Sequence, residues 1–216
     1  MPPHATALLA FDGSRIDGSL FTSVTDFARD TRWLNAPVAL ATNLGLGFLA
    51  VFMLMGWWKA RRRDDAAMAR ALAAPVSVLT AFAVAEVVKR LVAEARPCRS
   101  LPQDYFVSAC PAPGDYAFPS GHATVAVATA AALFLLDRRL AALAAVFTLW
   151  ECVTRVYVGD HYPHDVLGSL LIATPVALAS SLLLARLASP LITRLRVGGA
   201  LRPLLIAHAA KTATAR

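Results

Sequence analysis

Five apolar stretches separated by short polar segments dominate the pattern of this chain. They cover residues 37–58, 66–92, 120–136, 140–158 and 165–187. About 20 apolar residues in a helix are enough to cross roughly 30 Å of hydrocarbon in a bilayer. The pattern therefore predicts an all-α integral membrane protein, a helical bundle of about five transmembrane helices.

Residues 1–35 form an N-terminal arm before the first apolar stretch. Leu20, Val24 and Phe27 recur at helical spacing among charged residues, which predicts an amphipathic helix in the membrane interface within residues 15–33. A solvated arm with a few apolar residues is the alternative. No secretory signal peptide is expected, because the first apolar run, residues 5–11, is short.

The last segment, residues 189–216, follows the predicted membrane domain of residues 36–188. Gly198, Gly199 and Pro203 interrupt it, and it carries several arginines. We expect a basic tail on the cytoplasmic side that lies in the interface or is loose from Pro190 onward.

Composition supports the membrane assignment. The chain is 57% hydrophobic and only 16% charged, with a mean hydropathy of +0.56, whereas soluble domains are typically about 45–50% apolar and about 25% charged. The net charge of +7 lies in short clusters between apolar stretches, so we expect no nucleic-acid partner. Basic loops face the cytoplasm, which places residues 59–63, 138–139 and the tail inside. The N-terminus is then outside, in a multi-pass protein of the inner (plasma) membrane.

Two of the three cysteines, Cys98 and Cys110, fall in the predicted outer loop of residues 97–119. An oxidising compartment would permit a disulfide between them, and two free thiols are the alternative. Cys152 lies within a predicted span and is interpreted as a small packing residue.

Ionisable and polar residues gather at the predicted outer ends of the spans. Such residues are costly near hydrocarbon and usually mark function. Three cations, two imidazoles and one carboxylate at one level predict an anion site with acid–base chemistry. The residues are Lys89, Arg96, Ser120, His122, Arg155, His161 and Asp165.

The first motif is Lys89 with Arg96 and the second is Ser120 to His122, and the spacing within each favours anion binding. Lys89 and Arg96 are two helical turns apart and share a face, although either alone is also explained by snorkelling at the interface. Ser120 is a suitable N-cap, and Gly121 lets a ligand approach the free N–H groups of a helix start. An ordinary cap with an incidental His122 is the alternative.

The third motif pairs an imidazole with a carboxylate. A helix beginning near Pro163 would bring Asp165 to His161, which fixes the tautomer and leaves the other ring nitrogen free to attack. A short polar loop is the alternative. The sequence assigns no role to His164, nor to His4 and His208 in the tails.

Two acids precede the cations at helical spacing. Glu86 lies three residues before Lys89, and Glu151 lies four before Arg155. Each either orients its cation for phosphate binding or merely neutralises it.

Together the motifs resemble the type 2 phosphatidic acid phosphatase superfamily, over roughly residues 36–188. The matching positions are Lys89, Arg96-Pro97, Pro119-Ser120-Gly121-His122, Arg155, His161 and Asp165. Thr154 departs from the serine usual before the arginine, but it keeps the hydroxyl.

The resemblance implies a metal-independent phosphatase with a helical core. His161 would be the nucleophile that forms a phosphohistidine, Asp165 would orient it, and His122 would protonate the leaving oxygen and then activate water. The phosphoryl oxygens would be bound by Lys89, Arg96, Ser120, the Gly121 N–H and Arg155. No cofactor is expected, and no acid or histidine cluster shows metal-ligand spacing.

A site at the membrane–water boundary suits a lipid whose phosphate lies at headgroup level. Resemblance to small bacterial members favours a polyprenyl (undecaprenyl) diphosphate. The alternatives are phosphatidylglycerophosphate, phosphatidic acid, a lipid phosphotransferase, and a non-catalytic lipid-phosphate binder or transporter. Vanadate-dependent haloperoxidases share the motifs but are soluble, which argues against them. The sequence leaves the oligomeric state open.

Overall fold

The fold is built almost entirely from helices. The computed structural model describes residues 11–198 and 201–206. In chain order the helices of this part are α1 (Ser14–Asp30), α2 (Arg32–Ala60), α3 (Asp65–Val92), α4 (Pro97–Ser100), α5 (Gly121–Leu136), α6 (Arg138–Tyr157), α7 (Pro163–Val197) and α8 (Arg202–Leu205).

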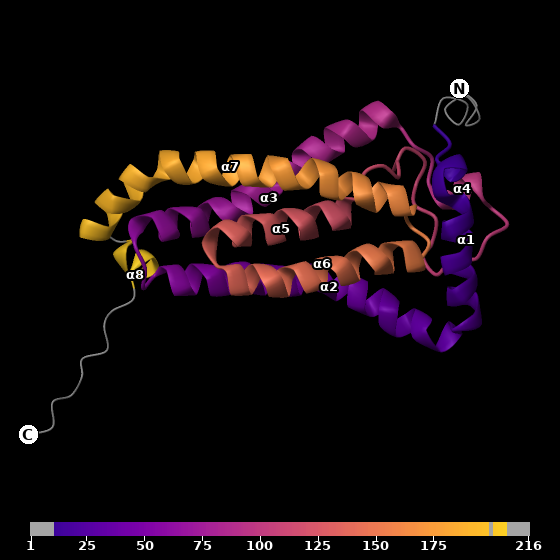
Figure 1. The fold of residues 1–216 in the computed structure, drawn as a ribbon, viewed down its shortest axis with the longest axis horizontal. Coiled ribbons are helices and arrows are strands. Elements are labelled where there is room, and N and C mark those ends of the chain that lie inside the picture. Colours follow the sequence, from indigo (N-terminus) through magenta and orange to yellow (C-terminus); the bar gives the residue numbers. More distant parts are fainter. Residues whose placement is uncertain (1–10, 199–200, 207–216) are drawn as a thin grey trace, which may run out of the picture.

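Five of these helices run side by side as a bundle (Figure 1). Helix α5 packs against α2, α3, α6 and α7. Its buried face is built mainly from small residues, including Ala123, Ala126, Ala128 and Ala132, which let neighbouring backbones approach closely. Helices α2, α3, α6 and α7 are long and apolar enough to cross a membrane, and α5 is a shorter apolar helix. The predicted five-helix membrane bundle is confirmed.

Side chains that accept hydrogen bonds from free backbone amides mark where three helices begin. Asp64 caps α3 by accepting from the Ala67 N–H, and Ser120 caps α5. Asp137 caps α6 by accepting from two backbone N–H groups. Such caps satisfy donors that have no partner within the helix, and they place these starts within two residues of the predicted ones.

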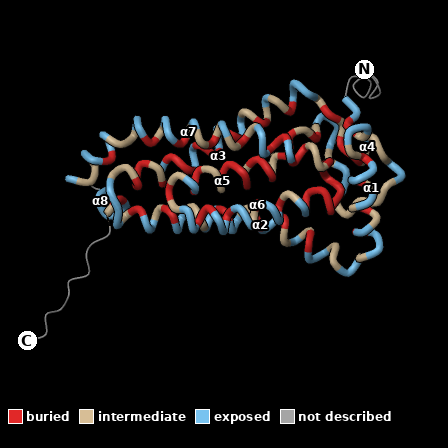
Figure 2. The backbone as a smooth tube through the Cα atoms, in the orientation of Figure 1, coloured by how far each residue is buried: buried red, intermediate tan, exposed pale blue. Residues whose placement is uncertain are grey.

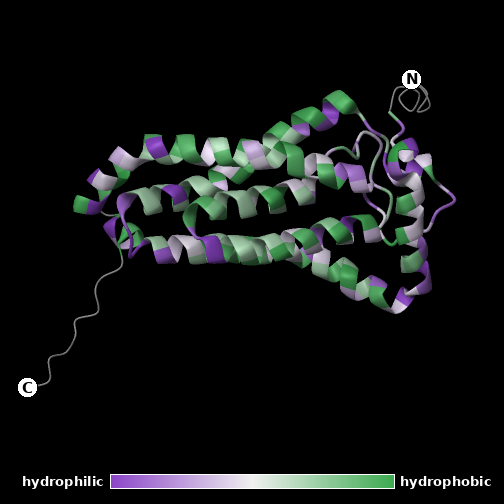
Figure 3. Cartoon of the chain, viewed as in Figure 1, coloured by the Kyte–Doolittle hydropathy of each residue, from purple (hydrophilic) through white to green (hydrophobic). Residues whose placement is uncertain are grey.

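The outward faces of the bundle are apolar. Buried residues line the inner faces of the helices, while exposed ones point outward (Figure 2). Apolar residues cover the middle of the bundle and hydrophilic ones gather toward its ends (Figure 3). Many outward leucines are more than half exposed, such as Leu79 and Leu171. So large an apolar surface is untypical of a soluble monomer, and it identifies a multi-pass membrane protein.

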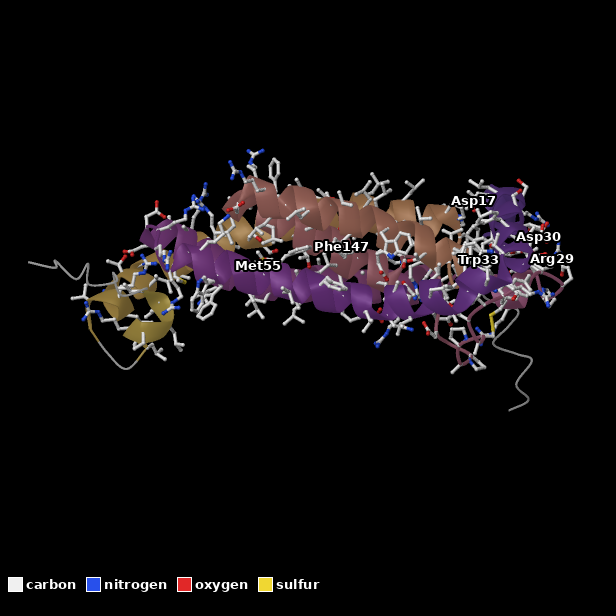
Figure 4. The ribbon with its side chains drawn as sticks, turned by 90° about the horizontal axis from the view of Figure 1, so that it is seen from below. Asp17, Arg29, Asp30, Trp33, Met55 and Phe147 are labelled. Carbon is white, nitrogen blue, oxygen red and sulfur yellow. A yellow bond between two sulfur atoms is a disulfide. The ribbon has the colours of Figure 1, made fainter. Side chains whose placement is uncertain are left out.

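Helix α1 lies across one end of the bundle, which we call the α1 end (Figure 1). It buries Phe21 and Ala28 and leaves Leu20 and Phe27 exposed. Asp17, Arg29, Asp30 and Trp33 lie at this end, whereas Met55 and Phe147 lie along the middle of the bundle (Figure 4). The predicted N-terminal amphipathic helix is therefore present.

The loop between α3 and α5 also belongs to the α1 end. A disulfide joins Cys98 to Cys110, with 5.9 Å between their Cα atoms. Cys152, on α6, is a half-buried free thiol.

The last helix extends beyond the expected span of residues 165–187. Helix α7 includes Pro190 and continues to Val197, so the expected domain boundary at residue 188 falls inside a helix. The physical reason lies in contacts of Arg196 with other parts of the chain. Arg196 donates to the carbonyl oxygens of Arg63 (2.9 Å), Ala60 (3.1 Å) and Leu205 (3.1 Å), and pairs with Asp65 at 2.8 Å. These contacts hold the last turns of α7 against the α2–α3 connection and α8.

Replacing Arg196 by alanine should loosen this end of the molecule. The substitution Arg196→Ala removes one hydrogen-bond donor from each of several carbonyl groups and from Asp65, which should cost about 1–3 kcal/mol. A lower midpoint of thermal unfolding in detergent would show the loss. Arg194→Ala is the matched control, because Arg194 is exposed on the same turn. Equal midpoints for the two variants would contradict the assigned anchoring role.

Candidate functional site

A cavity of about 710 Å³ opens at the α1 end between α2, α3 and α5. It collects most of the residues that the sequence analysis singled out, although they come from four separate segments. These are Glu86, Lys89, Arg96, Gly121, His122, Arg155 and His161. Ser120 and Asp165 lie directly behind the wall and are fully buried.

His161 lies in the turn between α6 and α7 with both ring nitrogens engaged. Its Nδ1 is 3.3 Å from Asp165 Oδ2, and its Nε2 is 2.9 Å from an Arg96 guanidinium nitrogen. A guanidinium can only donate, so Nε2 accepts and Nδ1 carries the proton. Burial, and then the positive charges of Arg96, Arg155 and Lys89, hold the pKa of His161 well below its ordinary value. The ring is therefore neutral, with a lone pair on the nitrogen opposite Asp165.

Asp165 connects the second and third motifs. Its Oδ2 also accepts from the Tyr162 backbone N–H at 2.8 Å, which satisfies a free amide at the start of α7. Its carbonyl oxygen accepts from the Ser120 N–H at 3.3 Å. Ser169 reinforces this junction, since its hydroxyl lies 2.9 Å from the carbonyl oxygens of both Ser120 and Asp165. The sequence analysis missed Ser169, because its partner Ser120 is far away in sequence.

Each of the three cations in the cavity is paired with a carboxylate. Lys89 lies 3.1 Å from Glu86, as the sequence spacing suggested. Arg96 binds Asp115 through both its side chain (2.8 Å) and its carbonyl oxygen (3.2 Å). Lys89 also approaches Asp115, at 3.9 Å. Asp115 is about half exposed, so it is the carboxylate most easily displaced by another anion.

Arg155 pairs with Asp160 rather than with Glu151. The chain turns at Gly159, whose φ of +87° suits glycine, and this turn returns Asp160 to the guanidinium. Burial raises the pKa of Asp160, and the charges of Arg155 and Arg96 oppose that shift.

Glu151 has a different partner. It accepts a hydrogen bond from Thr42 of α2 at 2.8 Å, and Thr154 donates to the same threonine at 3.1 Å. Glu151 and Thr154 therefore join α6 to α2, and the expected pairing of Glu151 with Arg155 is not found.

The second motif forms the start of α5. The Ser120 hydroxyl accepts from the Ala123 N–H at 3.5 Å and does not line the cavity, so it acts here as a cap. A Cβ at Gly121 would lie 3.8 Å from Lys89 Nζ and 3.4 Å from Phe82. Glycine therefore keeps the helix start close to the cations, where free N–H groups favour an anion. His122 faces the cavity one residue later.

His164, to which the sequence analysis gave no role, belongs to a partly buried cluster behind this wall. Its ring lies 2.7 Å from Asp17 of α1 and 2.8 Å from Glu94. Donor atoms of Glu94, His164 and Asp165 lie within 4.8 Å of one another, which makes them the candidate metal-binding group of the described residues. The sequence gave no signal for this cluster, since its members come from three distant segments. His4 and His208 lie outside the described residues.

Comparison with known proteins relates the chain to membrane phosphatases. The undecaprenyl-diphosphatase BcrC of Bacillus subtilis is 41% identical over 63 residues, covering 29% of this chain and 33% of that protein. An undecaprenyl-diphosphatase of Sulfolobus acidocaldarius is 31% identical over 106 residues, 49% of this chain and 50% of that protein. A lipid A 1-phosphatase of Rhizobium johnstonii is 36% identical over 107 residues, 48% and 43% respectively. The matches thus span a third to a half of these relatives.

A solved structure has the same arrangement of helices. It is the crystal structure of the first transmembrane PAP2 type phosphatidylglycerolphosphate phosphatase from Bacillus subtilis, with a TM-score of 0.56 and 20% sequence identity. The likeness covers 86% of this chain and 90% of that one. At this identity it supports the fold alone.

The family model extends the relation over most of the bundle and over all three motifs. The model of the PAP2 superfamily matches residues 70–188, more than half of the chain and the whole region from Lys89 to Asp165. The chain therefore belongs to the PAP2 superfamily.

Proposed function

We propose that the protein is a metal-independent lipid phosphatase that hydrolyses a polyprenyl diphosphate, with undecaprenyl diphosphate as the preferred substrate. The observation that carries this proposal is the neutral His161, whose Nε2 accepts from Arg96 at the wall of a cavity that Lys89 and Arg155 also line. A neutral imidazole surrounded by positive charge is suited to attack a phosphoryl group, because phosphoryl transfer depends on positioning and charge stabilisation.

The first half-reaction transfers the phosphoryl group to the enzyme. His161 Nε2 forms a bond to the terminal phosphorus while the bond from phosphorus to the bridging oxygen breaks. His122 gives its proton to that oxygen, which leaves as the lipid monophosphate. Lys89, Arg96 and Arg155 neutralise the phosphoryl oxygens, and Asp165 holds the Nδ1 proton of His161 as positive charge develops on the ring.

The second half-reaction releases phosphate. His122, now without its proton, takes one from water, whose oxygen attacks the phosphorus as the phosphorus–nitrogen bond breaks. Inorganic phosphate leaves and both histidines return to their starting states. An alcohol that replaced water would make the enzyme a lipid phosphotransferase, so product analysis belongs in any assay.

The shape of the cavity supports a lipid substrate. Beyond the cations its wall is apolar, formed by Leu46 of α2 and by Val78, Leu79 and Phe82 of α3. Leu79 is largely exposed on the outer face of the bundle. A phosphate held at the cations would therefore have an apolar path toward the membrane for its chain. The two relatives named as undecaprenyl-diphosphatases favour a polyprenyl chain.

The charge distribution supports an extracytoplasmic site. The α2–α3 connection, the α5–α6 connection and the end of α7 lie together at the end of the bundle opposite α1 (Figure 1). Arginines are concentrated in these segments. Basic loops favour the cytoplasmic side, so the α1 end would face outward in the plasma membrane, where an undecaprenyl carrier is released during wall assembly.

The proposal predicts chelator-resistant phosphate release that depends on His161. The protein would be purified in detergent and assayed with excess chelator on undecaprenyl diphosphate, phosphatidylglycerophosphate, phosphatidic acid and lipid A. We expect the highest kcat/KM with undecaprenyl diphosphate, and a loss of at least about a thousandfold in His161→Ala. The unfolding midpoint of the variant would show that it remains folded.

The alternatives give different results in the same assay. A higher kcat/KM with another lipid would identify that lipid as the substrate and would leave the histidine mechanism intact. Normal turnover by His161→Ala would overturn the nucleophile assignment. Chelator-sensitive activity would overturn the metal-independent mechanism, and phosphate found on an added alcohol would identify a transferase.

Asp115 provides a second prediction, because its carboxylate occupies Arg96 and approaches Lys89 in the substrate-free site. A phosphate must displace it. Asp115→Asn should therefore lower KM about 3–10-fold with little change in kcat, as expected for one partly exposed ion pair of about 1 kcal/mol. Asp104→Asn is the matched control, since Asp104 lies in the same loop but accepts from Thr22. A higher KM in Asp115→Asn would show instead that Asp115 positions Arg96 for binding.

Membrane orientation can be tested by cysteine labelling in intact cells. In a Cys152→Ser background, Asp30→Cys at the α1 end should react with a membrane-impermeant maleimide. Arg62→Cys, at the opposite end, should react only after the cells are permeabilised. Both parent residues are exposed, so the reverse pattern would place the site on the cytoplasmic side.

A further inference from the structure

Resting on the phosphatase function proposed above, we propose that His164 is a positioning residue: a fixed imidazolium that keeps Asp165 in its carboxylate form and thereby holds His161 in the attacking tautomer. His164 does not line the cavity. It would act through Asp165 and not on the substrate.

The contacts of His164 indicate that its ring is charged. Nδ1 lies 2.7 Å from Asp17 Oδ1, and Nε2 lies 2.8 Å from Glu94 Oε1. An ionised carboxylate only accepts, so with Asp17 and Glu94 ionised both ring nitrogens carry a proton and the ring is an imidazolium. The backbone N–H of His164 also donates to Asp17 Oδ2, at 2.7 Å. Asp17 thus binds both the ring and the free amide at the start of α7.

Aromatic rings fix the orientation of this imidazolium. The Tyr162 ring stacks on it with centroids 5.4 Å apart and planes 12° apart. The Phe118 ring also stacks on it, at 6.3 Å and 22°. A cation on an aromatic face is stabilised by the negative charge of the ring face. Three carboxylates at its edge and two stacked rings leave His164 little freedom to turn.

Asp165 needs this positive charge because its environment disfavours a carboxylate. It is fully buried, and the neighbouring Glu94 is 1% exposed. Oδ2 is satisfied by His161 and Tyr162, but Oδ1 has no hydrogen-bond partner among the described residues. His164 Nε2 lies 3.7 Å from Oδ1 and forms an ion pair with it. Two buried carboxylates side by side favour protonation of one of them, and the imidazolium between them opposes it.

The protonation state of Asp165 decides the tautomer of His161. A carboxylate accepts a hydrogen bond from the Nδ1–H of His161 and leaves Nε2 without a proton. A protonated Asp165 would offer a donor in the same place and weaken this preference. The charged or titratable groups that face Asp165 and His164 are Asp17 from α1, Glu94 and Arg96 from the segment after α3, and His161 from the turn before α7.

The decisive experiment compares pH profiles of kcat on the preferred lipid for wild type, His164→Asn and Glu94→Gln. Removing the imidazolium should lower kcat about 10–100-fold with KM within about twofold, and should move the acidic limb of the profile to higher pH. Removing the charge of Glu94 should move the same limb to lower pH. A merely structural role cannot produce opposite shifts.

Two further variants separate charge from packing. Asp17→Asn breaks the link from α1 but leaves Glu94 and Asp165 beside the imidazolium, so it should lower the unfolding midpoint without moving the acidic limb. His164→Lys should restore part of the lost kcat, because it returns a cation to the cluster. If His164→Asn does not fold, the pH profile of Glu94→Gln tests the proposal: an acidic limb at lower pH supports it, and an unchanged limb contradicts it.

The results that would overturn the role of His164 differ from those that would overturn the phosphatase proposal. That proposal fails if wild type releases no phosphate or His161→Ala remains active. The role of His164 is overturned if wild type acts through His161 but His164→Asn keeps its kcat and profile, or loses stability alone. It is also overturned if elemental analysis finds a divalent metal bound stoichiometrically to wild type and lost from His164→Asn, because the cluster would then be a metal site.

Discussion

The need to pair charged side chains beside an apolar membrane interior governs the α1 end of this protein. Unpaired charges are costly there, and the structure pairs Lys89 with Glu86, Arg96 with Asp115 and Arg155 with Asp160. These pairs give an anion site that is neutralised before substrate arrives. They also explain why acidic residues lie in a site proposed to bind phosphate, because each pairs with a cation in the absence of a ligand.

The helix bundle makes this arrangement stable by fixing where the helix ends lie. Small residues on α5 allow it to sit among four other helices, so that its first residues, Gly121 and His122, reach the cavity. The Ser120 N–H and the Ser169 hydroxyl then connect this helix start to the carbonyl oxygen of Asp165. The second and third motifs are therefore held as one unit, which suits a reaction that depends on positioning.

The cavity has two parts of different chemistry, one cationic and one apolar. Its cationic end contains the groups of the three sequence motifs and, in the proposed function, would hold the phosphoryl group. Its apolar end, lined from α2 and α3, would then contact the chain of the lipid. Related proteins named for undecaprenyl diphosphate, lipid A and phosphatidylglycerolphosphate are consistent with one reaction centre combined with different lipid-facing walls.

The order of apolar and polar residues by itself determined the five spans, the cap at Ser120 and the closeness of His161 to Asp165, because each depends on residues near one another in the sequence. It failed where the partner is distant or is set by a turn. Arg196 holds α7 past Pro190 by binding the α2–α3 connection. Glu151 binds Thr42 of α2, and Asp160 pairs with Arg155 because the chain turns back at Gly159. The cluster of Asp17, Glu94 and His164 has no local pattern. Only the tertiary structure decided these contacts, since a buried charge takes the partner that folding brings near, not the one nearest in sequence.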